Sequence, residues 1–172
     1  DSGFSFQLEL KTGAYSFIYV EETALLRALE GRRPMPSPHP SWSVSAGLEG
    51  KPTVINNAET LASVSAILQK NADWYAGYGT ERSKGTKIFT LAGKLAHTGF
   101  IEIPMGIPLS QIINDIGGGI PDNKGLKGAL VGGPSGGFLS AGALNNPVDY
   151  ENLASAGALI GSGGIIVADN DT

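Results

Sequence analysis

The sequence predicts an α+β fold, because three patterns follow one another in its second half. Residues 87–92 and 100–103 are short, largely apolar runs joined through glycines, and they predict a β-hairpin. The apolar residues from 109 to 116 then recur at the i, i+3, i+4, i+7 spacing of an amphipathic helix. Residues 127–131 are a further apolar strand candidate. Hairpin, helix and strand in this order are typical of a β-grasp, or ubiquitin-like, module.

The rest of this module follows along the chain. Residues 149–159 predict a second helix, and the apolar run 164–168 predicts a final strand in the centre of the sheet. The glycine-rich segment 132–137 lacks the Lys-Ser/Thr ending of a P-loop and the spacing of a dinucleotide fingerprint, so we expect a tight turn there. A polar stretch before the hairpin divides the chain into domains 1–82 and 83–172.

The first half contains weaker signals. Alternating apolar and polar residues at 4–10 predict a half-buried strand, and residues 14–20 form a second apolar run. Residues 23–29 are strong helix formers and predict a helix. Four prolines between residues 32 and 45 predict an extended loop, and helical spacing returns from residue 58 to residue 70.

Composition excludes several classes of protein. The net charge of −4 over 172 residues argues against broad nucleic-acid binding, which needs a basic surface. The apolar runs are much shorter than a bilayer is thick, so we expect no direct membrane insertion and a cytoplasmic location. The chain has no cysteine, two histidines and no calcium-loop spacing of carboxylates, so no metal site is predicted.

The strongest candidate site lies between residues 51 and 61. β-Branched residues lead into the adjacent carboxamides Asn56 and Asn57, and a helical pattern begins at Ala58 with Thr60 in its first turn. A strand end that delivers amides to a helix N-terminus suits a polar or anionic ligand. The residue types alone leave open the alternative that Asn56 and Asn57 only form the turn and the helix cap.

Two adjacent carboxylates, Glu21 and Glu22, precede the helix predicted at 23–29. The helix dipole favours acidic residues in a first turn, which accounts for both without a ligand. The functional alternative is that one carboxylate lies beside a ligand and the other caps the helix. We interpret His39, between prolines, and His97, in the hairpin connection, as surface loop residues.

Six segments extend this interpretation: EETALLRALEG at 21–31, GKPTVINNAETL at 50–61, DWYAG at 73–77, SKGTK at 83–87, GGPSGG at 132–137 and GSGGIIV at 161–167. In order and spacing they resemble the family of flavin (FMN)- and NADH-binding subunits of respiratory complex I and of the related NAD(P)-linked hydrogenases and formate dehydrogenases. The resemblance covers essentially the whole chain, and the GGPSGG segment is most like the hydrogenase and formate dehydrogenase branches.

The resemblance implies a fold and a chemistry. Residues 1–82 would be the closing part of a Rossmann-like FMN- and NADH-binding α/β domain, and residues 83–172 a soluble-ligand-binding β-grasp domain. The full-length subunit would pass hydride from NADH to FMN and electrons to a 4Fe-4S cluster held outside this cysteine-free chain. Its partners would be other subunits of a multi-subunit oxidoreductase, and no nucleic acid.

The resemblance also implies the cofactor site. It consists of Ile55, Asn56, Asn57 and Thr60 for FMN, and of Glu21 and Glu22, the candidate catalytic residues, beside the flavin and the nicotinamide. The family's glycine-rich flavin-phosphate loop has no counterpart in these residues, and Val20 and Phe138 stand where relatives carry glycine and cysteine. We therefore expect the isolated chain to be inactive. The alternative function is a non-catalytic β-grasp binding or assembly module.

Overall fold

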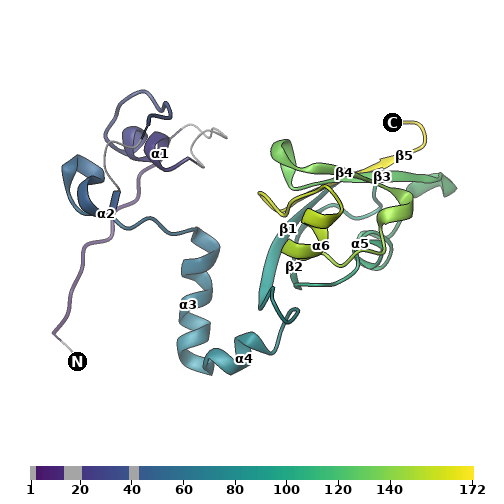
Figure 1. The fold of residues 1–172 in the computed structure, drawn as a ribbon, viewed down its shortest axis with the longest axis horizontal. Coiled ribbons are helices and arrows are strands. Elements are labelled where there is room, and N and C mark those ends of the chain that lie inside the picture. Colours follow the sequence, from purple (N-terminus) through teal and green to yellow (C-terminus); the bar gives the residue numbers. More distant parts are fainter. Residues whose placement is uncertain (1–2, 14–20, 39–42) are drawn as a thin grey trace. The chain divides into compact units, whose positions relative to one another are not determined.

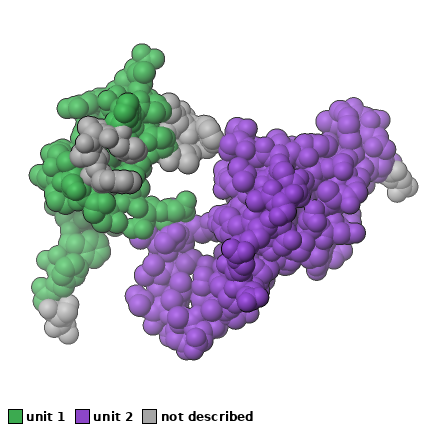
Figure 2. All heavy atoms as spheres, in the orientation of Figure 1, with its two compact units in different colours: residues 1–57 green, residues 58–172 purple. Residues whose placement is uncertain are grey.

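The computed structural model describes residues 3–13, 21–38 and 43–172 (Figure 1). The chain divides into two compact units, Asp1–Asn57 and Ala58–Thr172 (Figure 2). This division precedes the domain boundary predicted at residues 82 and 83, because the helix that starts at Ala58 makes contacts within the second unit.

The described part of the first unit contains short helices and no strand. Helix α1 (Glu22–Leu29) confirms the helix predicted at 23–29, and α2 (Ser43–Ala46) and the 3-10 turn η2 (Leu48–Gly50) follow it. The strand predicted at 4–10 is wrong, since residues 3–13 form no regular element and their side chains are exposed. A strand needs a neighbour for its backbone hydrogen bonds, and the described residues of this unit offer none. The apolar run at 14–20 lies outside the described residues.

The second unit is built around a five-stranded mixed sheet. Its strand order is β2-β1-β5-β3-β4, with β1 and β5 parallel and the other neighbours antiparallel. The elements are α3 (Ala58–Lys70), α4 (Ala72–Ala76), β1 (Thr86–Gly93), β2 (Gly99–Pro104), α5 (Leu109–Gln111), η3 (Ile112–Ile116), η4 (Pro121–Asn123), β3 (Leu126–Val131), η5 (Gly133–Ser135), β4 (Gly137–Ser140), η6 (Ala141–Ala143), α6 (Tyr150–Ser155) and β5 (Gly164–Asp169).

Most elements predicted for this unit are confirmed. The hairpin is β1–β2, the third predicted strand is β3, and β5 occupies the centre of the sheet. The helix predicted at 109–116 is present but widens to π geometry in η3, where the Gly117 amide donates to the Ile112 carbonyl at 2.8 Å. The second predicted helix is shorter than expected, because Gly157 adopts a φ of +80° just beyond α6.

The hydrophobic core lies on one face of the sheet. Side chains on a strand alternate between faces, and Phe89, Ile165 and Val131 are fully buried beneath α5, η3 and α6. The opposite face is more open, with Ile88 45%, Phe138 53% and Ile166 46% exposed. The sheet thus has one face buried by helices and one face that is largely solvent-accessible.

Asp169 at the end of β5 should make the stability depend on pH. The Thr172 hydroxyl donates to its carboxylate at 2.6 Å and holds the pKa of Asp169 below its ordinary value of 3.8; the Asp171 amide and the charges of Lys94 and Lys124 act in the same direction, against the effect of burial. A carboxyl whose folded pKa is depressed contributes stability above its unfolded pKa and loses it as the pH falls through the folded value.

Asp169→Asn should therefore be less stable than the parent chain at neutral pH. The difference in free energy of unfolding should shrink once the pH falls below 3.8, the ordinary pKa of the carboxyl. Urea unfolding at neutral and acidic pH measures this difference. If the difference in free energy of unfolding between Asp169→Asn and the parent chain does not change with pH, the lowered pKa of Asp169 is wrong.

Candidate functional site

The start of α3 presents the polar residues that the sequence singles out. The helix begins at Ala58 as predicted, so Asn56 and Asn57 directly precede it and Thr60 lies in its first turn. The side chains of Asn56, Asn57 and Thr60 are exposed, and Ile55 is half-buried. The three polar groups are therefore accessible from solvent.

Glu59, between these residues, joins α3 to strand β1. Its carboxylate accepts a hydrogen bond from the Lys87 ammonium at 2.7 Å and another from the Ile88 backbone amide at 2.6 Å. The Glu59 and Lys87 side chains are only 28% and 18% exposed. This contact fixes the first turn of α3 against the sheet.

The two carboxylates predicted at the nicotinamide end behave differently from each other. Glu21 is the N-cap of α1, and its carboxylate accepts the Ala24 amide at 2.9 Å and the Thr23 hydroxyl. The Thr23 hydroxyl oxygen in turn accepts the Ser37 amide at 3.0 Å. Glu22 is the first residue of the helix and is half-buried. Glu21 is thus the carboxylate that caps the helix.

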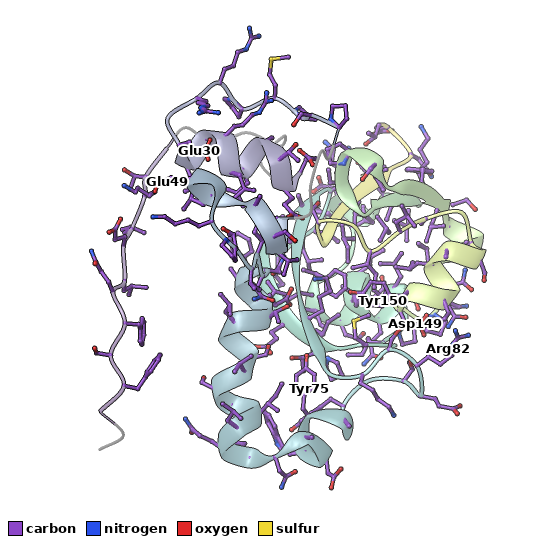
Figure 3. All side chains as sticks on the ribbon, turned by 60° about the vertical axis from the view of Figure 1, so that its left-hand side comes forward. Glu30, Glu49, Tyr75, Arg82, Asp149 and Tyr150 are labelled. Atoms are coloured by element: carbon purple, nitrogen blue, oxygen red, sulfur yellow. The ribbon has the colours of Figure 1, made fainter. Side chains whose placement is uncertain are left out.

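A second polar contact in the first unit is structural. The Glu30 carboxylate accepts the backbone amide of Glu49 at 2.8 Å and so joins the end of α1 to η2 (Figure 3). Glu49 has a φ of +53°, a conformation that this contact supports.

Polar residues before β1 form a network with α6, in the region of Arg82, Asp149 and Tyr150 in Figure 3. Asp149 caps α6 by accepting the Asn152 amide at 2.7 Å. The Ser83 hydroxyl donates to Glu151 at 2.8 Å and accepts the Tyr150 amide. These groups satisfy one another, so the network has a structural explanation.

A groove of about 250 Å³ lies between α3, α4 and the β1–β2 hairpin. Trp74, Tyr75, Ser63 and Ala66 form one wall, and the hairpin side includes Glu102. The Tyr75 ring (labelled in Figure 3) packs so closely on Gly85 that a Cβ there would lie 2.1 Å from it. The groove shows that the middle of α3 does not pack tightly on the sheet.

Two other predicted features are confirmed as structural. Residues 132–136 form the turn between β3 and β4, and residue 137 begins β4. Gly132, with a φ of +98°, donates its amide to the Gly164 carbonyl at 2.8 Å. His97 is exposed in the hairpin connection, where its backbone amide donates to the Gly117 carbonyl. His39 lies outside the described residues.

The residues predicted to contact FMN are distributed over both units. Ile55, Asn56 and Asn57, like Glu21 and Glu22, belong to the first unit, and Thr60 belongs to the second. By residue type, carboxamides and a hydroxyl can hydrogen-bond the polar part of FMN, and the dipole of the 13-residue helix α3 favours an anion at its start. The chemistry of these residue types therefore fits that part of the cofactor.

Over residues 3–13, 21–38 and 43–172, no three histidine or acidic side chains gather as a metal site. In the same part of the chain, no helix has the length and apolar character needed to cross a bilayer.

Sequence reasoning missed the contact between Glu59 and Lys87. These residues are 28 positions apart, and their pairing depends on how α3 returns to the hairpin. The available signal was an acidic residue in the first turn of a predicted helix, which the helix dipole already explains.

Comparison with known proteins places the chain among oxidoreductase subunits. No family model matches it. It is 51% identical, over 99% of its length, to the NADP-reducing hydrogenase subunit HndC of Solidesulfovibrio fructosivorans. It is 39% identical, again over 99%, to the F 2 subunit of the NADH-quinone oxidoreductase of Rhizobium meliloti. A crystal structure of an NAD+-reducing [NiFe]-hydrogenase in the H2-reduced state superimposes on the chain with a TM-score of 0.79 and 34% sequence identity. The match covers 93% of this chain and 26% of the hydrogenase chain.

The chain spans 35% of the length of HndC and 41% of the length of the Rhizobium meliloti protein. It belongs to the family that contains HndC and the F subunits of NADH-quinone oxidoreductases, and it matches a part of their length. The resemblance inferred from the six segments is confirmed.

Proposed function

We propose that this chain is the part of an NADH dehydrogenase flavoprotein subunit that forms one wall of an FMN site. In that subunit hydride passes from NADH to FMN, and electrons continue to a 4Fe-4S cluster held outside these residues. The observation that carries the proposal is the exposed trio Asn56, Asn57 and Thr60 at the start of α3, in a chain homologous throughout to NADH- and NADP-linked subunits.

The fold supports the same proposal. A sheet of order β2-β1-β5-β3-β4, with β1 parallel to β5 and helices on one face, is compatible with a soluble-ligand-binding β-grasp domain at residues 83–172. Residues 1–82 would then be the closing part of the Rossmann-like FMN- and NADH-binding domain.

Each candidate residue has a role that its chemistry allows. The flavin supplies the redox chemistry when bound. Asn56, Asn57 and Thr60 would hydrogen-bond its polar part, with the Ile55 backbone beside it. Because the Glu21 carboxylate is used in capping α1, Glu22 is the better candidate for accepting hydrogen bonds from NADH ribose hydroxyls, and Glu21 would orient it.

The proposed partners are other subunits of a cytoplasmic multi-subunit oxidoreductase. A second candidate function, a non-catalytic β-grasp binding or assembly module, is favoured by the open sheet face of Ile88, Phe138 and Ile166. The first function requires the complete polypeptide to bind flavin, and the second does not.

An absorbance titration of the complete polypeptide that carries this sequence tests the proposal. The polypeptide should take up FMN, and NADH added under anaerobic conditions should then bleach the visible absorbance band of the flavin. A colourless protein that takes up no FMN would contradict the flavoprotein proposal and favour the binding module.

A further inference from the structure

We infer that Glu59 is a positioning residue for the proposed FMN site, with Lys87 as its partner. The inference rests on the proposed function, since it concerns how Thr60 and its helix turn are held for the cofactor. Glu59 directly precedes Thr60, and its carboxylate receives hydrogen bonds from both Lys87 and Ile88 of β1.

The backbone of β1 explains why a carboxylate is needed at this point. Thr90 donates its amide to Gly163, just before β5 begins. Backbone amides two residues apart on a strand point to the same side, so the Ile88 amide also points to the β5 side of β1. Because β5 begins only at Gly164, the Ile88 amide points past its end. Glu59 accepts this amide at 2.6 Å and takes the place of a further strand residue. The first turn of α3 is thereby joined to the ladder of the sheet.

The rest of α3 packs less closely on the sheet than its first turn. None of its residues is buried, and the groove of about 250 Å³ separates its middle from the hairpin. A helix held mainly at its first turn depends on the contact made there. Loss of the Glu59 contact should therefore loosen the turn that carries Thr60.

Charge supplies a second reason for the pairing. An unpaired carboxylate beside Thr60 would repel an anionic ligand at the helix N-terminus, whereas the ion pair with Lys87 at 2.7 Å offsets that charge. Partial burial of both side chains limits screening by solvent. Because Lys87 offsets the charge of Glu59, the first turn of α3 can receive an anionic ligand although it contains a glutamate.

The test uses the complete polypeptide with Glu59→Ala, Glu59→Gln and Lys87→Met. Without FMN, hydrogen exchange at the start of α3 should accelerate in Glu59→Ala, while the core strands stay protected. The FMN dissociation constant should rise by up to about tenfold, because loosening of the turn that carries Thr60 outweighs the attraction of the anion by the unpaired Lys87 charge. Glu59→Gln keeps an acceptor for the Ile88 amide, so it should rescue part of both effects, and Lys87→Met should weaken FMN binding while the helix stays protected.

The matched control is Asp171→Asn, which removes an ion pair with Lys124 at 2.9 Å on another part of the same unit. It should leave the FMN dissociation constant and the visible circular dichroism of bound flavin unchanged. If the parent polypeptide binds FMN and Glu59→Ala changes neither α3 exchange nor FMN affinity, the positioning role is wrong. If the parent binds no FMN, the proposed function fails, and the exchange of α3 alone decides whether Glu59 anchors the helix.

Discussion

Gly132→Ala is expected to destabilise the second unit by about 3 kcal/mol or more, the sum of a strained backbone and a forced displacement. Gly132 has a φ of +98° and is buried where β3 enters the turn to β4. A Cβ there would lie 2.3 Å from the Leu159 carbonyl oxygen, which belongs to the backbone and cannot rotate away as a side chain would. The glycine is thus required both for its conformation and for the close approach of two segments.

Gly142→Ala is the matched control. Gly142 lies in η6, its φ is not in the left-handed region, and a Cβ there would meet nothing within 4 Å. Chemical denaturation should show a change of no more than about 1 kcal/mol, in either direction. Equal destabilisation by the two substitutions would contradict the proposed role of the turn.

Ile165→Ala should have an effect of similar size through the core. Ile165 is fully buried on the central strand β5, and truncation of a buried isoleucine costs about 2 to 5 kcal/mol because a cavity remains. Its neighbour Ile166 faces the open side of the sheet and is 46% exposed. Ile166→Ala should therefore cost only about 1 kcal/mol, in proportion to the smaller area buried. Similar losses in urea unfolding would show that the open face is covered by other parts of the protein.

The elements that could be predicted from sequence are those with local signals. The β1–β2 hairpin and β5 have apolar runs next to glycines. Chain order indicates the pairing of β1 with β2, whereas the place of β5 between β1 and β3 was expected from the β-grasp order of elements. Strand β4 was missed because Gly137–Ser140 has only four residues after the glycine turn. The strand at residues 4–10 was wrongly predicted because alternation indicates which face would be buried, not whether a partner strand exists.

The candidate site was predictable in part for the same reason. The helix start at Ala58 follows from a local pattern, and the structure bears it out. The sequence placed Glu21 and Glu22 at the start of α1, and the structure adds that Glu21 is the cap. The link from Glu59 to Lys87 depends on the tertiary path through α4, which no local pattern encodes. The FMN roles of Asn56, Asn57 and Thr60 come from the family resemblance and stay predictions.

The most direct measurement of the central claim is FMN affinity in the complete polypeptide with Asn56→Ala and Asn57→Ala combined. We expect the dissociation constant to rise at least about tenfold, since lost hydrogen bonds to a polar or charged cofactor are each worth about 1 kcal/mol or more. Asn114→Ala, at an exposed asparagine in η3, is the control and should leave the affinity unchanged. If the parent binds FMN and the double substitution retains it with unchanged affinity, the start of α3 is not a wall of the flavin site.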